Sequence, residues 1–78
     1  MSNSNLRPIF VILGKAEDNN RICINANDII YIKEKDPWEC LVFIRMPDQD
    51  GSEAIHIKEP IFDVYHKVRQ VLNYTYTN

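Results

Sequence analysis

The chain has 78 residues, a formal net charge of −2 and 45% hydrophobic residues. This length predicts one domain, and the composition is too apolar for a disordered chain. The acidic balance disfavours nucleic-acid binding, because such binding depends on a basic footprint that displaces counterions. The first residues do not resemble a signal peptide and no apolar run is long enough for a bilayer, so we expect a cytoplasmic protein that makes no membrane contact.

Five short strands are predicted in the first three quarters of the chain. Residues 1–5 are polar and are expected to fray. The strands are expected at Leu6–Leu13, Arg21–Asn25, Ile29–Lys35, Glu39–Met46 and Glu53–Lys58. Clusters of Gly, Asn, Asp and Pro separate them, and the Asp-Gly pair within residues 48–52 is typical of a hairpin turn.

A change of period near residue 60 predicts one amphipathic helix. Apolar side chains recur with helical spacing and form a single stripe: Ile61, Val64, Tyr65, Val68, Val71 and Leu72. Pro60 suits the first helical position, because its missing N–H would be unpaired there in any case. We expect the helix to run from about Pro60 to Asn73, with residues 74–78 as a loose tail and residues 6–73 as the single domain.

These elements predict an α+β fold: a small antiparallel sheet or barrel-like arrangement of about five strands, with one C-terminal amphipathic helix. One helix covers only one face of a sheet, yet several strands are apolar on both faces. On the predicted fourth strand, for example, Leu41 and Phe43 oppose Val42 and Ile44. Such strands in a small domain predict either a closed barrel-like core or an oligomer interface, and we favour a homo-oligomer.

The residues that acid–base catalysis would use are scattered along the chain. His56 with Glu59 or Asp63 would make an acid–base pair, and His66 would add to it. A general base also needs an orienting partner and a pocket, and the pattern predicts neither. The two glycines are isolated, so no phosphate-binding loop is present. We expect a protein that is not an enzyme and has no catalytic residues.

Metal and cofactor sites are not expected either. Cys23 and Cys40 lie in strand-like runs and fit small buried hydrophobic residues better than a disulfide. Together with the two histidines they lack the ligand spacing of a zinc site. The acidic turn around residues 48–53 is flanked by strands, whereas a calcium loop of the EF-hand kind lies between helices.

The residues that we assign to an interaction surface are Trp38, Phe62, His66 and Arg69. The last three are spaced i, i+4 and i+7, which places them on a second stripe of the helix beside the core stripe. Aromatic residues and Arg are the types that dominate binding hot spots. The alternative for Trp38, which the sequence supports about as well, is that it only covers the edge of a barrel. If the protein binds a small ligand, Arg45, Trp38 and Arg69 are the candidate ligand-binding residues.

The pattern of isoleucines resembles the small flagellar FlbD-like family over roughly residues 9–72. The matching pieces are Ile22-Cys23-Ile24-Asn25, Ile29 or Ile30 with Ile32, and Ile55-His56-Ile57-Lys58-Glu59 leading into Ile61-Phe62-Asp63-Val64. The resemblance implies a small cytosolic protein of β-sheet plus helix without catalytic residues. Pro60 stands where that family tends to have Ser, and the hairpin region is longer here.

Two other families share parts of this outline. The carbon-storage regulator CsrA also has five short strands and a C-terminal helix, and it binds RNA as a dimer. LytTR-type DNA-binding domains share the phrase Asp-Ile-Ile-Tyr-Ile, found here at residues 28–32. The basic contact residues of both families have no clear counterpart in this chain.

The leading functional hypothesis is therefore a non-catalytic interaction module, homo-oligomeric, that binds or inhibits a protein partner. An oligomer that holds a nucleotide or another small molecule between subunits is the alternative. A nucleic-acid binder of the CsrA or LytTR kind is the third reading. A bacterial or a phage source fits a protein of this size.

Overall fold

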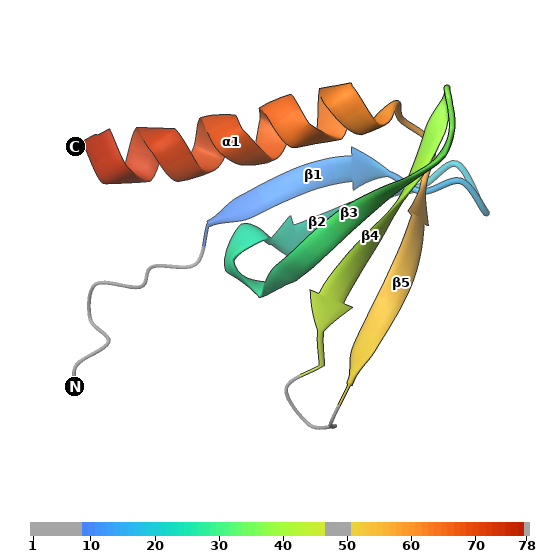
Figure 1. The fold of residues 1–78 in the computed structure, drawn as a ribbon, viewed down its shortest axis with the longest axis horizontal. Helices are drawn as coiled ribbons and strands as arrows, with labels where there is room; N and C mark the ends of the chain where they lie inside the picture. Colours follow the sequence, from blue (N-terminus) through green and yellow to red (C-terminus); the bar gives the residue numbers. More distant parts are fainter. Residues whose placement is uncertain (1–8, 47–50, 78) are drawn as a thin grey trace.

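The computed structural model describes residues 9–46 and 51–77, the last four of these by backbone alone. In this part of the chain, five antiparallel strands form two sheets, and one helix follows them (Figure 1). The predicted α+β class is thus confirmed. The barrel-like alternative is wrong, because the strands form two separate sheets that do not close into a barrel.

The two sheets divide the strands between them in chain order. The first sheet pairs β1 (Phe10–Gly14) with β2 (Arg21–Asn25), and the second has the order β3 (Ile29–Asp36), β4 (Glu39–Arg45), β5 (Ser52–Ile57). The predicted bounds of β2 are confirmed; those of β3 and β4 differ by one residue at the C-terminal end, and those of β5 by one residue at each end. β1 begins at Phe10, and residues 6–8 of the strand predicted from Leu6 lie outside the described part.

The helix α1 spans Ile61–Thr77 and is one turn longer than expected. The prediction that residues 74–78 form a loose tail is therefore wrong for residues 74–77. No Gly or Pro follows Asn73 to stop the helix, and Tyr and Thr reduce helix propensity only weakly. Pro60 lies just before the helix, where its carbonyl accepts hydrogen bonds from the backbone N–H groups of Asp63 and Val64. No helix of the described residues is both long and apolar enough to cross a membrane.

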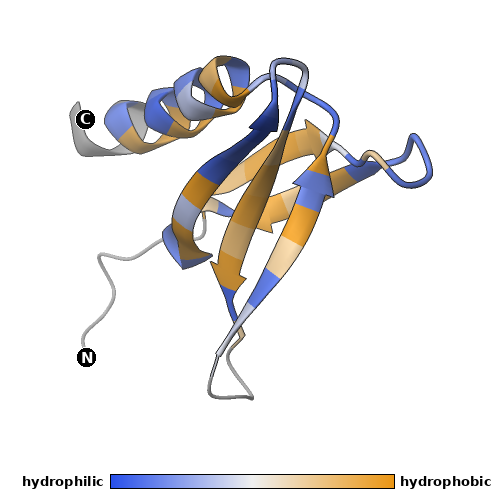
Figure 2. Cartoon of the chain, turned by 45° about the vertical axis from the view of Figure 1, so that its right-hand side comes forward, coloured by the Kyte–Doolittle hydropathy of each residue, from blue (hydrophilic) through white to orange (hydrophobic). Residues whose placement is uncertain are grey.

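The core forms where the inward faces of the two sheets meet the helix. Alternate residues of each strand point inward, as the strand period requires. The buried cluster consists of Val11, Leu13, Ile24, Cys40, Val42, Ile55, Ile57 and Val64. Figure 2 shows the same distribution, with apolar segments running through the strands and polar segments at the β1–β2 turn and along the helix. Ile55 and Ile57 alternate along β5, and both point inward.

One corner joins the two sheets and the start of the helix. The carbonyl of Gly14 accepts a hydrogen bond from the backbone N–H of Lys58 over 2.7 Å. The N–H of Gly14 donates to Oε2 of Glu59 over 2.9 Å, and Oε1 of Glu59 accepts from Nζ of Lys67 over 2.7 Å. Beside this corner an isolated bridge pairs Lys15 with Ile57. β1 is therefore attached to the end of β5, and α1 is fixed to the end of β1.

The polar segment between β2 and β3 is a structural corner. Residues Ala26–Asp28 form a single 3₁₀ turn, and Oδ1 of Asn25 accepts a hydrogen bond from the backbone N–H of Asn27 over 3.0 Å. The N–H of Ala26 donates to the carbonyl of Ile9 over 2.7 Å, which ties this turn to the start of β1. An Asn side chain that bonds the backbone two residues on is a common way to close such a turn.

Truncation of one core isoleucine tests this packing. Ile57 is fully buried, whereas Ile12 on the outer face of β1 is 55% exposed. We expect Ile57→Ala to lower the free energy of unfolding by about 2–5 kcal/mol, because it removes buried methyl groups and leaves a cavity. Ile12→Ala is the matched control and should cost well under half as much. Urea unfolding followed by circular dichroism measures both values, and equal losses would contradict the assigned faces.

Candidate functional site

An open apolar groove lies between the edge of β3 and the helix α1. Its volume is about 530 Å³, and its lining consists of Ile29, Tyr31, Ile32, Glu34, Ile61, Phe62 and Tyr65. Six of these seven residues are apolar or aromatic. Two elements far apart in the sequence thus build one surface of the kind that takes a hydrophobic partner.

Large aromatic side chains at this groove are exposed. Phe62 is 71% exposed, Tyr31 is 53% exposed and Tyr65 is 45% exposed. Tyr31 is held by stacking on Phe43 of β4, with ring centroids 4.4 Å apart. The sequence placed Tyr65 in the core stripe of the helix, but Val64 takes the buried position and Tyr65 lies at the rim. The single stripe inferred from spacing is therefore narrower than predicted.

The backbone of β3 is the second component of this surface. Among the described strands, β3 pairs only with β4, so its other edge has no strand beside it. Unpaired N–H and C=O groups on such an edge are a template for a further strand. The pairing with β4 shifts register between Ile29 and Tyr31 and again between Glu34 and Asp36. Regular pairing geometry is thus confined to Tyr31–Glu34.

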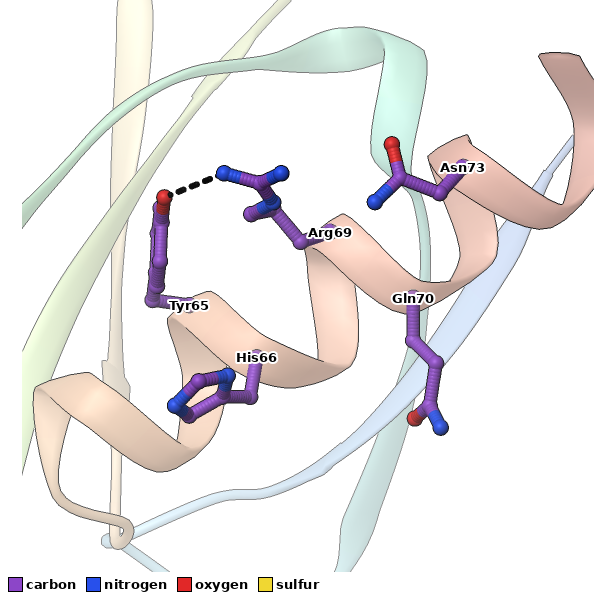
Figure 3. Close-up of a pocket in the computed structure, with 5 residues that line it drawn as sticks. All are labelled: Tyr65, His66, Arg69, Gln70 and Asn73. Carbon is purple, nitrogen blue, oxygen red and sulfur yellow. Dashed lines mark hydrogen bonds between the residues drawn. The ribbon is translucent and has the colours of Figure 1, made fainter. Parts of the chain in front are cut away.

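A shallow hollow continues along the helix from the groove. Tyr65, His66, Arg69, Gln70 and Asn73 line it, and Figure 3 shows Tyr65 and Arg69 pointing the same way while His66 and Gln70 turn aside. Nη1 of Arg69 donates to the hydroxyl of Tyr65 over 3.0 Å, and its guanidinium lies 5.8 Å from the ring centroid. This hydrogen bond raises the pKa of Arg69 further, so the helix face carries a fixed positive charge.

The predicted interaction residues divide between these two surfaces. Phe62 lines the groove, and His66 and Arg69 line the hollow. Tyr65, which the spacing places in the core stripe of the helix, lines both surfaces. Trp38 lines neither one; it is 74% exposed in the turn between β3 and β4, where its backbone N–H donates to Oδ1 of Asp36 over 2.8 Å. The structure thus brings the helical residues of the predicted patch to neighbouring surfaces and places Trp38 apart from them; their role in binding stays a prediction.

The predicted ligand-binding residues do not converge. Trp38 precedes β4 and Arg45 ends it, so the length of the strand separates them by roughly 20 Å. Within one chain these two residues therefore do not form a single binding site. Arg69 stands in the hollow on α1, with Tyr65 as its hydrogen-bond partner.

The histidine on β5 pairs with a different carboxylate from those considered in the sequence. Nε2 of His56 lies 2.5 Å from Oε1 of Glu39, and Nζ of Lys35 lies 3.9 Å from the same oxygen. Glu59 instead bonds the backbone of Gly14. Glu39 and His56 are 17 residues apart and meet only because β4 and β5 pair. The contact ties the outer faces of two strands together, and Lys35 competes for the carboxylate that would otherwise orient a general base.

In the described part of the chain, no group of three or more His, Cys, Asp or Glu side chains could hold a metal ion. The two cysteines differ in their surroundings. Cys23 is exposed, whereas Cys40 is fully buried in the core. Burial, together with the negative charge of Glu59, raises the pKa of the Cys40 thiol to about 11.

Thiol labelling distinguishes these two positions. At pH 8 the Cys40 thiol stays protonated, because its pKa of about 11 lies well above that pH. Its burial also keeps the labelling reagent away from the sulfur. We expect one fast-reacting thiol per chain in native protein and two after denaturation, read with Ellman's reagent. Cys23→Ser should remove the fast reaction. Two fast thiols in the native protein would contradict the burial of Cys40.

Comparison with known proteins gives no identification: no family model matches the sequence, and no curated protein matches it. The resemblance to the FlbD-like family therefore stays a prediction.

Proposed function

We propose that this chain is a non-catalytic interaction module that self-associates and binds a protein partner through apolar surface left uncovered by its single helix. One observation carries the proposal. In the described residues, seven large apolar side chains are exposed: Phe10, Ile12, Ile30, Tyr31, Trp38, Phe62 and Tyr65. Five of the seven are aromatic, and aromatic residues dominate the energetics of binding surfaces.

The energetic reason is the cost of leaving such groups in water. Removing apolar surface from water is favourable by about 25 cal/mol of free energy per Å². One well-covered Phe or Tyr side chain therefore contributes on the order of 1.5–3 kcal/mol to association. Tyr31, Phe62 and Tyr65 gather at the groove between β3 and α1. Covering these three side chains with one partner would contribute several kcal/mol of favourable free energy. The loss of translational, rotational and side-chain freedom on association opposes this gain.

The small-molecule alternative has weaker support. Its anion-binding and stacking groups, Arg45 and Trp38, stand at opposite ends of β4. Nucleic-acid binding is disfavoured by the net charge of −2. We therefore retain the interaction module as the proposed function.

Replacement of one groove aromatic tests the self-association. We expect the wild-type chain to sediment as an oligomer at tens of micromolar in analytical ultracentrifugation. Phe62→Ser should weaken the association at least about tenfold, because one exposed aromatic anchor is lost from each copy. Phe10→Ser is the matched control: it removes an equally large exposed side chain from β1, away from the groove. A wild type that stays monomeric at 200 µM would contradict the self-association.

Binding of a protein partner is tested with the same variants. Immobilised wild type, Phe62→Ser and Phe10→Ser are exposed to lysate of the source cells, and retained proteins are identified by mass spectrometry. A partner that docks on the groove should be retained by wild type and by Phe10→Ser, and should be lost with Phe62→Ser. Identical sets of retained proteins for all three would count against the groove as the binding surface.

A further inference from the structure

We propose that the occupant of the groove is the same groove of a second copy, with the two β3 strands paired antiparallel across a two-fold axis at Ile32. The two three-stranded sheets would then form one continuous sheet. Because a two-fold axis perpendicular to a sheet keeps both core faces on the same side, the helix of each copy would stand beside that of the other. The proposal deepens the self-association proposed above and rests on it.

β3 is the free edge best suited to this role. It has eight residues, whereas the other edge strands have five (β1 and β2) and six (β5). The end of β5 is already bridged to Lys15. An apolar groove lies beside β3, lined by residues from the strand and from α1. A second copy supplies both things that this edge lacks, namely a strand for its backbone and aromatic side chains for the groove.

The charges on β3 select the position of the axis. Residues on the same face must lie opposite each other, so a symmetric pair is centred on one residue. An axis at Lys33 or at Glu34 sets two like charges directly opposite each other, which is destabilising. An axis at Ile32 sets Ile32 against its own copy and Tyr31 against Lys33 of the other chain. No like charges then face each other between Ile29 and Lys35.

This arrangement also uses the regular part of the strand. The register shifts leave Tyr31–Glu34 regularly paired with β4, and Ile32 lies inside that segment. Tyr31 and Lys33 alternate with Ile32 and stand on the outer face, where the ring of Tyr31 is half-exposed and stacked on Phe43. A lysine over such a ring adds a cation–π contact. An axis at Tyr31 also avoids like charges, but its symmetric ladder ends at Lys33 and is shorter.

The helix contributes the remaining contact. Phe62 and Tyr65 line the groove from the α1 side, and both are exposed. With the partner strand in place, these two side chains would lie over the partner's β3 and beside its helix. The same event that pairs the strand edges therefore covers the groove, and a peptide without its own helix would cover less of it.

A charge exchange across the axis tests the interface. Tyr31→Lys sets two lysines opposite each other at two symmetric places, so we expect dimerisation to weaken at least tenfold in sedimentation equilibrium. Adding Lys33→Glu to this variant sets Lys against Glu and should restore the dimer to within about threefold of wild type. Ile12→Lys, which adds the same charge on the outer face of β1, is the control and should leave the dimer intact.

Cysteine pairing tests the register itself. In a Cys23→Ser background, Tyr31→Cys and Lys33→Cys are made in separate chains, which are mixed and oxidised. The axis at Ile32 predicts a fast disulfide between residue 31 of one chain and residue 33 of the other, and slow linkage of either variant with itself. Cys40 is buried and does not compete.

The possible results separate the two proposals. Fast linkage of Lys33→Cys with itself would move the axis and overturn the inference, as would a dimer that Tyr31→Lys leaves unchanged. A wild-type chain that is monomeric would overturn the self-association as well. Circular dichroism of each variant shows whether it folds. If Tyr31→Lys does not fold, the mixed disulfide at residues 31 and 33 decides the question.

Discussion

The backbone of Gly14 is the point on which the rest of the structure depends. Both of its polar groups are taken by the segment that leads from β5 into α1: its carbonyl by Lys58 and its N–H by the carboxylate of Glu59. The other oxygen of Glu59 binds Lys67 on the helix. A buried or half-buried N–H without an acceptor is costly, and a charged acceptor is the stronger kind. One side chain thus fixes the first sheet, the second sheet and the helix relative to one another.

Because β1, the end of β5 and the start of α1 are joined at this one corner, other sides of the core remain uncovered. The link between β1 and β5 closes one side of the two-sheet core, and α1 covers part of another, where it packs on β1 and β3. The free edge of β3 remains beside the helix, with Tyr31 and Phe62 exposed there. No further strand or helix of the described residues covers this side, and we propose that a second copy of the chain covers it. For this reason the groove, rather than the polar corner at residues 25–28, carries the proposed function.

The sequence predicts the local features of this fold and not the contacts between distant residues. Strand alternation identifies Ile55 and Ile57 as core residues, and the Asn side chain before the 3₁₀ turn is a local signal. The contact of Glu39 with His56 depends on the register of two strands, and that of Gly14 with Glu59 joins residues 45 positions apart. The spacing of residues in the sequence indicates neither of these two contacts. The groove could not be predicted for the same reason, because it forms only where β3 and α1 lie side by side. The sequence did predict an oligomer, from strands that are apolar on both faces.

The charges of β3 restrict its pairing rather than prevent it. Exposed edges invite unspecific association, and lysines and bulges are the usual protection. Here Lys33 and Glu34 oppose their own copies in two registers, and bulges at both ends of the strand limit how far a foreign strand could continue the ladder. The register centred on Ile32 brings no like charges together, and its central pairs, Ile32 with its copy and Tyr31 with Lys33, lie inside the regular segment. Repulsion in the wrong registers and apolar contact in one of them together give specificity. Under the proposed pairing, the charges that follow the three isoleucines of β3 favour one symmetric register of a second copy over the others.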